Sequence, residues 1–145
     1  MQGEASASVD LAADPETVFA AVSDWERQGQ WIPLTRVRVV DGPPGLGQRV
    51  VARTAVGRIG FDDSMTVTWW DPPHRCEVLH TGRVVRGTGV FLVEPVDGGS
   101  RFTWQERVLV PGGSLARLVW PAARVVTRAC LALAQRRLAR QLEDG

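Results

Sequence analysis

The chain has 145 residues, of which 44% are hydrophobic and 23% are charged, and its formal net charge is +1. This composition is typical of a globular domain, which we expect to span residues 1–145, and it excludes a disordered chain. The near-neutral charge provides no long-range attraction for nucleic acid, so we expect no nucleic-acid partner.

The residue types that are missing exclude several kinds of chemistry. All 17 basic residues are arginines, so there is no lysine for a Schiff base, a phosphate loop or a general base. There is no tyrosine to act as a phenolic acid. Cys76 and Cys130 match no zinc-ligand spacing, and we interpret them as free thiols in a reducing compartment. The absence of a leader-like N-terminus and of any window long enough to span a bilayer predicts a cytoplasmic protein without stable membrane insertion.

The first thirty residues predict a strand followed by two short helices. Apolar and polar residues alternate over 5–11, as in a half-buried strand. Asp14, Pro15 and Glu16 then supply an N-cap, a proline at the first helical position and an acidic first turn. A second short helix is predicted over 25–30, ended by Pro33.

The middle of the chain reads as one strand after another. Strands are predicted over 35–39, 48–56, 61–69, 75–81, 84–93 and 101–110, separated by turns rich in Gly, Pro and Asp. In the 61–69 strand, Phe61, Met65, Val67 and Trp69 share one face, and Trp70 is expected to point the other way. Gly87 and Gly89 are interpreted as relieving a bend, since no helix follows them to form a phosphate loop.

The last predicted element is a long helix over 114–143. Seven apolar residues fall on one face and should cover the sheet: Leu115, Leu118, Val119, Ala122, Val126, Ala129 and Leu133. Pro121 predicts a kink, or a separate short helix over 114–120 that acts as a lid. Beyond Leu133 the stripe breaks, so the final turns are expected to project past the sheet.

These elements predict an α+β fold of the helix-grip type: a curved antiparallel sheet of about seven strands wrapped around a long C-terminal helix, with two short helices after the first strand. Local motifs resemble the START/birch-pollen-allergen-like superfamily (SRPBCC), in particular its bacterial polyketide cyclase/dehydrase-like branch. The motifs are Val9-x-Leu11 with Ala13 to Phe19, Trp25 and Trp31, Gly47-x-Arg49, Trp70 to Pro73, and Gly98 to Thr103.

The resemblance implies an apolar cavity between the sheet and the long helix, in a superfamily that includes lipid carriers, hormone receptors, aromatase/cyclases and ring hydroxylases. A ring-hydroxylase iron site is excluded by the residues themselves. The only histidines, His74 and His80, are about 20 Å apart if they lie in one strand, which is too far to share an ion. We expect no metal and no cofactor.

Glu106 is the most informative polar residue. It shares a strand face with Phe102, Trp104 and Val108, which would carry it into the cavity, where burial would raise the pKa of its carboxyl group. Alternatively it lies at the sheet edge, solvated or bound to an arginine such as Arg53. His80 is its expected companion, although the sequence does not establish that the two side chains meet.

Three functions remain open from the sequence. The leading one is binding, with or without transport, of a small apolar molecule such as a polyketide, lipid or isoprenoid by a monomer or homodimer. The second is a polyketide cyclase or dehydratase using His80 and Glu106 as acid and base. The third is a surface-mediated protein-interaction module. The predicted ligand-binding residues are Trp31, Arg53, Met65, Val67, Trp69, His80, Trp104, Glu106, Leu118 and Val126.

Overall fold

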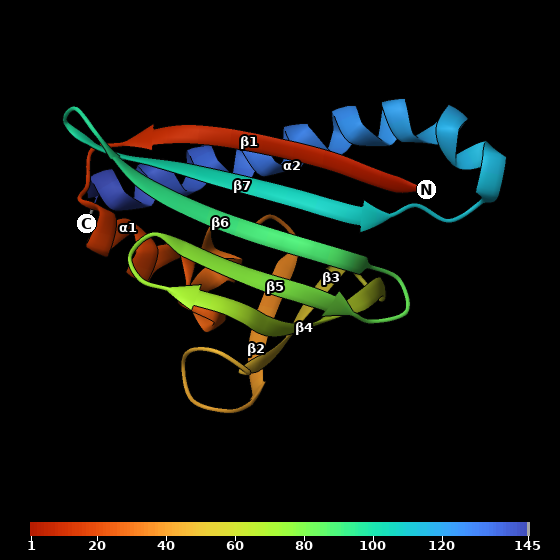
Figure 1. Cartoon of the computed structure of the whole chain (residues 1–145), viewed down its shortest axis with the longest axis horizontal. Helices are drawn as coiled ribbons and strands as arrows, with labels where there is room; N and C mark the ends of the chain where they lie inside the picture. The colour runs from red at the N-terminus through yellow and green to blue at the C-terminus, as the bar shows by residue number, and fades with distance from the viewer. Residues whose placement is uncertain (145) are drawn as a thin grey trace.

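In the computed structural model, which describes residues 1–144, the strands form one seven-stranded antiparallel sheet (Figure 1). The order across the sheet is β1-β7-β6-β5-β4-β3-β2, so only the first strand is out of sequence with its neighbours. The strands are β1 (Gln2–Leu11), β2 (Thr35–Asp41), β3 (Arg49–Val56), β4 (Ile59–Asp71), β5 (Arg75–Thr81), β6 (Arg86–Val96) and β7 (Gly99–Leu109).

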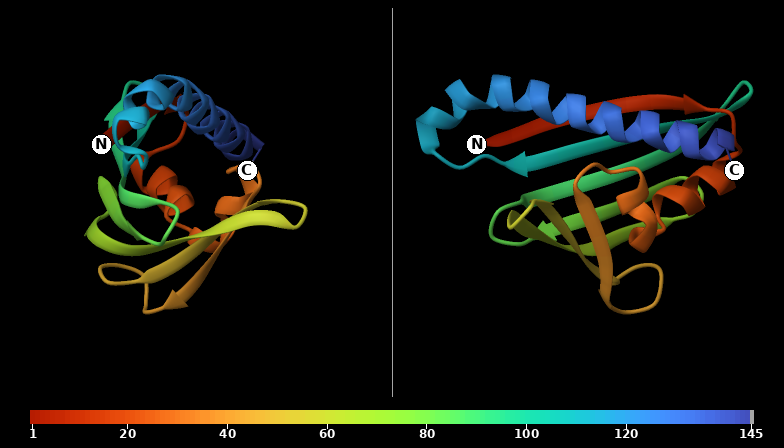
Figure 2. Two further views of the ribbon diagram at one scale, coloured as in Figure 1. Left: turned by 90° about the vertical axis from the view of Figure 1, so that its right-hand side faces the viewer. Right: turned by 180° about the vertical axis from the view of Figure 1, so that it is seen from behind.

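The helices are α1 (Pro15–Val22), the 3-10 helix η1 (Trp25–Gln30), the 3-10 turn η2 (Gly113–Leu115) and α2 (Ala116–Asp144). Viewed end-on, the sheet curls around α1 and η1, and α2 runs along the remaining side (Figure 2). The predicted helix-grip architecture is confirmed, including the two short helices after the first strand.

Helix α1 begins as its sequence predicts. The Asp14 carboxylate accepts a hydrogen bond of 2.7 Å from the backbone N–H of Thr17, and Pro15 occupies the first turn, where a missing N–H costs nothing. Val18, Phe19 and Val22 are buried on one face of the helix. These side chains join the main hydrophobic core, which fills the space between α1, η1 and the concave side of the sheet.

The prediction of which side of α2 faces the sheet is wrong. The residues of α2 that are buried are Ala116, Leu131, Ala134, Gln135 and Leu138. Leu118, in the middle of the predicted stripe, is 77% exposed, and Val126 is exposed too. The helix lies along β1, the edge strand (Figure 1).

Two contacts explain this orientation of α2. The Gln135 amide donates a hydrogen bond of 2.8 Å to the carbonyl of Ala7, and so it satisfies a polar group at the sheet edge. The indole of Trp120 covers Gly3 so closely that a Cβ at Gly3 would lie 2.5 Å from the ring. Hydrophobic periodicity alone detects neither contact, because Gln135 is polar and the space that Trp120 occupies is created by a glycine in a distant strand.

The C-terminal end of α2 also differs from expectation, whereas its N-terminal end follows one of the two alternatives predicted there. The final turns do not project past the sheet: Leu138 is 1% exposed, and the side chains of Arg137 and Gln141 donate to the carbonyl of Gln30. Pro121 lies inside a continuous helix rather than after a separate short one. The helix bends in its first turns (Figure 2), as expected where proline removes a backbone hydrogen bond.

A bulge in β4 reverses the predicted directions of two tryptophans. The register between β4 and β5 shifts between Val67 and Trp69. After the shift, Trp70 points inward and meets Phe19 edge-on, with ring centroids 5.3 Å apart. Trp69 is exposed, and the Arg75 guanidinium stacks 4.6 Å from its ring centroid. The extra residue of a bulge moves every later side chain to the other face, so strict alternation fails here.

None of the helices between residues 1 and 144 combines the length and the apolarity needed to cross a bilayer.

Candidate functional site

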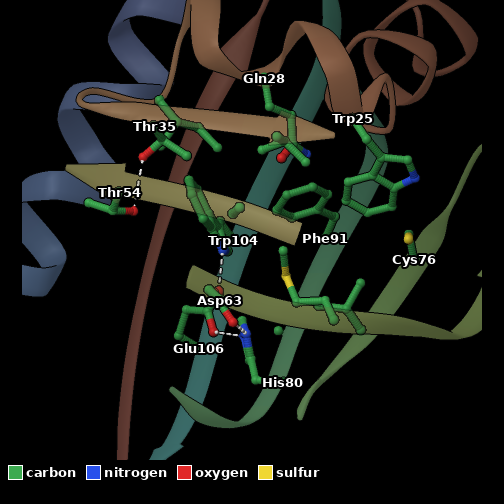
Figure 3. A pocket seen from close by; sticks show the side chains of 16 residues that line it. Trp25, Gln28, Thr35, Thr54, Asp63, Cys76, His80, Phe91, Trp104 and Glu106 are labelled. Carbon is green, nitrogen blue, oxygen red and sulfur yellow. Dashed lines mark hydrogen bonds and ion pairs between the residues drawn. The ribbon is translucent and has the colours of Figure 1, made fainter. Parts of the chain in front are cut away.

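A cavity of about 160 Å³ lies on the concave side of the sheet, capped by η1 (Figure 3). An engineered cavity of about 150 Å³ with apolar walls is large enough to bind benzene, so this space suits a small ring or the end of a larger molecule. Its lining residues are Trp25, Gln28, Ile32, Thr35, Val37, Ala52, Thr54, Asp63, Met65, Cys76, Val78, His80, Gly89, Phe91, Trp104 and Glu106.

The strands place these side chains through simple alternation. In β5 every second residue faces the cavity, namely Cys76, Val78 and His80. Val78 lies opposite Gly89 of β6, which in turn lies opposite Glu106 of β7. Aromatic walls stand beside them: Phe91 and Trp104 meet edge-on at 5.4 Å between ring centroids. The result is an apolar chamber with one polar end.

The polar end consists of a histidine held between two carboxylates. His80 Nδ1 is 2.8 Å from an oxygen of Asp63, and its Nε2 is 2.9 Å from an oxygen of Glu106. The indole N–H of Trp104 donates to the other oxygen of Glu106 at 2.9 Å. The side chains of His80, Asp63 and Glu106 are only 4%, 15% and 17% exposed. We refer to Asp63, His80 and Glu106 as the acidic triad.

The acidic triad keeps its imidazole protonated. Burial is the largest single influence on the pKa of His80 and acts to lower it, because it penalises the charged ring. The hydrogen bonds to Asp63 and Glu106, together with the negative charges of both, outweigh burial and raise this pKa to about 10. At neutral pH both ring nitrogens therefore carry protons and donate to the carboxylates.

Glycine at position 89 makes the His80–Glu106 contact possible. These two residues lie on β5 and β7, with β6 between them. The Glu106 carboxylate crosses over Gly89, where an added Cβ would lie 3.0 Å from one carboxylate oxygen and 3.2 Å from a methyl group of Val78. Gly89 is predicted to relieve a bend, and in the structure it also leaves room for the acidic side chain of Glu106. Gly87 has a different role: its φ of 133° and a Cβ clash with the Arg107 carbonyl require glycine there.

Six of the ten residues predicted to bind a ligand lie at or just behind the cavity wall. Met65, His80, Trp104 and Glu106 line it. Trp31 and Val67 are buried in the core but do not line the space. Trp31 supports the wall from behind, since its ring centroid lies 5.7 Å from that of Trp104.

The other four predicted residues do not line this cavity, each for a physical reason. Arg53 points to the outer face of β3, where it pairs with Asp62 at 3.4 Å and is half exposed. Trp69 is turned outward by the bulge in β4. Leu118 and Val126 belong to the exposed side of α2. Among residues 1–144, no residue of α2 lines the cavity, so it is not the predicted space between the sheet and the long helix.

Asp63 is the member of the acidic triad that sequence reasoning missed. It shares the parity of Met65 and Val67, and so it is an acid on the apolar face of its strand. The same signal led to Glu106 and could have identified Asp63. Cys76 agrees with its interpretation as a core thiol: it is buried, and burial followed by the charge of Glu77 raises its pKa to about 12.

No group of metal-ligating side chains in the described part of the chain has an arrangement suited to a metal ion. Both ring nitrogens of His80 are already engaged by carboxylates, which leaves neither lone pair for a metal.

The fold and this cavity together define a START-like helix-grip domain. The family model described as polyketide cyclase / dehydrase and lipid transport matches residues 2–143, so the chain belongs to that family. The description of that family covers polyketide cyclases, dehydrases and lipid transport, which are activities on hydrophobic molecules.

Similar proteins agree with this assignment. The uncharacterized protein Rv1546 of Mycobacterium tuberculosis is 37% identical over 103 residues, which cover 65% of this chain and 71% of that protein. A START superfamily protein from Mycobacterium smegmatis superposes with a TM-score of 0.78 at 17% identity, covering 97% of both chains. The di-domain ARO/CYC StfQ of the steffimycin biosynthetic pathway gives a TM-score of 0.80 at 12% identity, covering 99% of this chain and 51% of StfQ.

Proposed function

We propose that the protein binds a small, mostly apolar molecule in the cavity on the concave side of its sheet. The observation that supports this proposal is a space of about 160 Å³ whose walls are mostly aromatic and aliphatic, with polar groups gathered at one end. Ligand sites commonly combine apolar walls with a few convergent polar groups. Family membership supports the same class of function.

Toluene is a suitable first probe because its size is close to that of the cavity. We expect backbone amide signals of Phe91, Val78 and Trp104 to shift in an NMR titration, and the melting temperature to rise with toluene concentration. Ligand at about 100 times its Kd should add roughly 2.7 kcal/mol to the free energy of unfolding. Native mass spectrometry of the purified protein would reveal any molecule retained from the cell.

A cavity-filling variant provides the decisive control. Ala52 lines the cavity from β3, whereas Val51 lies on the opposite face of that strand. Ala52→Leu should abolish toluene binding without loss of the folded state, and Val51→Leu should leave binding unchanged. Unaltered binding in Ala52→Leu would show that toluene binds elsewhere and would remove the support for this site.

A cyclase or dehydratase using the acidic triad is the second candidate, favoured by the direct His80–Glu106 hydrogen bond at the cavity wall. A histidine with a pKa near 10 keeps its proton at neutral pH and cannot serve as the general base there. Glu106 or Asp63 would then have to accept the proton. If Glu106 is catalytic, Glu106→Gln should lower the reaction rate by about 10²–10⁴-fold. If the protein only binds its ligand, the same substitution should change only the affinity for that ligand.

The interaction-module alternative receives divided support. Such a module should have a filled interior, and the cavity argues against that. It should also have an exposed apolar patch, and the outer side of α2 provides one with Leu115, Leu118, Val119, Val125, Val126 and Leu133.

A further inference from the structure

The hydrogen-bond donors at the polar end of the cavity are already committed. Both N–H groups of the His80 imidazolium donate within the acidic triad, and the Trp104 indole N–H donates to Glu106. What remains for a ligand is acceptor capacity. Within residues 1–144, the second oxygen of Asp63 receives no hydrogen bond, and the Asp63 side chain lines the cavity and is 15% exposed.

The net charge at the polar end also favours a ligand that donates hydrogen bonds over one that accepts them. Two carboxylates and one imidazolium sum to −1, in a chamber whose other walls are mostly apolar. Although the chain has 17 arginines, none is among the cavity-lining residues of the described chain. The only other ionisable group in the lining is the thiol of Cys76, which burial keeps neutral.

The remaining polar groups of the lining lie on the opposite side of the chamber, as Figure 3 shows for Gln28, Thr35 and Thr54. Their donors are largely occupied by the protein: Gln28 donates to the carbonyl of Val22 at 2.8 Å, and Thr35 donates to the carbonyl of Pro33 at 2.9 Å. These groups therefore do not form a second anion-binding end.

We propose that the acidic triad selects ligands that carry a hydrogen-bond donor, with a protonated amine preferred over a hydroxyl group, and that it rejects carboxylates. This inference rests on the proposed function, because it assigns a polar group to the apolar ligand of the same cavity. An ammonium group can donate to the free oxygen of Asp63 and neutralise the excess charge. A carboxylate there would meet two like charges and no free donor.

Four probes of one size test this selection: toluene, benzyl alcohol, benzylamine and benzoate, titrated by NMR at pH 7.5. They share a benzene ring with a single one-carbon substituent. We expect benzylamine to bind about 10-fold or more tightly than toluene, benzyl alcohol to fall between them, and benzoate to bind more weakly than toluene. Equal affinities, or benzoate as the tightest ligand, would overturn the inference while leaving cavity binding intact. If none of the four binds, toluene included, the proposed function itself fails.

Neighbouring aspartates on opposite faces of β4 supply a matched pair of variants. Asp63→Asn removes the acceptor charge of the triad, and it should reduce the ratio of benzylamine to toluene affinity to near one. Asp62→Asn removes a charge from the outer face, where Asp62 pairs with Arg53, and it should leave that ratio unchanged. A preference for amine that survives Asp63→Asn would contradict the assignment. If Asp63→Asn does not fold, the order of the four probes in the unmodified protein still decides the question.

Discussion

His80 holds a charge inside a mostly apolar chamber, and the two carboxylates beside it are the reason that it can. Isolated burial would drive the proton off an imidazole, because the charged ring loses its hydration. Removing only one of the two carboxylates is also expected to destabilise the folded protein. Removing one carboxylate leaves a buried charge with half of its compensation, whereas removing the whole triad would leave an ordinary apolar wall.

The raised pKa of His80 makes the stability of the protein depend on pH. The unfolded histidine titrates near 6.5 and the folded one near 10, so between these values the folded state binds the extra proton. The contribution of His80 to the free energy of unfolding is therefore fully present below pH 6.5 and is lost as pH rises toward 10. From pH 7 to pH 9 we expect the free energy of unfolding to fall by roughly 2–3 kcal/mol, measured by urea denaturation.

The control for this measurement is His80→Gln, which cannot titrate. Its free energy of unfolding should be lower at pH 7 and should fall by only about 0.5 kcal/mol up to pH 9, because the Cys76 thiol ionises in the unfolded chain and not in the folded one. A slope in the variant equal to that of the unmodified protein would mean that the pH dependence comes from other groups. Measurements should stop near pH 9, where a cysteine with the unperturbed pKa of 9.0 is already half ionised in the unfolded chain, while the pKa of folded Cys76 lies near 12.

At the scale of elements, the sequence predicted which segments form helices and strands more reliably than which faces they bury. Caps and turns are local signals, and they located α1 and the succession of strands along the chain correctly. The bulge in β4 and the orientation of α2 depend on partners distant in sequence. Nothing near Trp69 announces the register shift that turns it outward.

The candidate site divides in the same way. His80 and Glu106 could be placed on inward faces by alternation, but their meeting required the strand order, with β6 between them, and a glycine at position 89. The charge of Arg53 makes it a candidate partner for Glu106, but the register of β3 pairs it with Asp62 across the outer face.

Two leucines of α2 test its observed orientation. Leu138 is 1% exposed and Leu118 is 77% exposed, although both belong to one helix. Leu138→Ala should reduce the free energy of unfolding by about 2–5 kcal/mol, because it leaves a hole in the core. Leu118→Ala should change it by no more than about 0.5 kcal/mol, as for other surface substitutions. Equal losses from chemical denaturation of the two variants would indicate that the predicted stripe, and not the observed face, covers the sheet.

At the scale of the whole molecule, burial is uneven. The core joins α1, η1, the inner face of the sheet and the second half of α2. The first half of α2 lies outside this core, with mostly exposed side chains over residues 117–130. Helical segments without tertiary packing open easily, since propensity alone gives little stability.

Hydrogen exchange measured by mass spectrometry or NMR should reveal this gradient. Amides in the central strands β6 and β7 should exchange most slowly, and those of residues 131–142 more slowly than those of residues 121–130. Comparable protection along the whole of α2 would show that its first half is held by contacts beyond those to Gly3 and Glu4.

The position of β1 has a consequence for how the protein is made. Gln2 lies opposite Leu109 and Leu11 opposite Ser100, so the earliest strand to leave the ribosome has its only sheet neighbour about a hundred residues later. During synthesis this segment must wait, unpaired, until the final hairpin emerges, and α2 can settle against it only afterwards. Such distant pairing slows folding because a long loop must close first. A nascent chain released before β7 emerges would therefore expose β1 as a free strand, open to association with other chains.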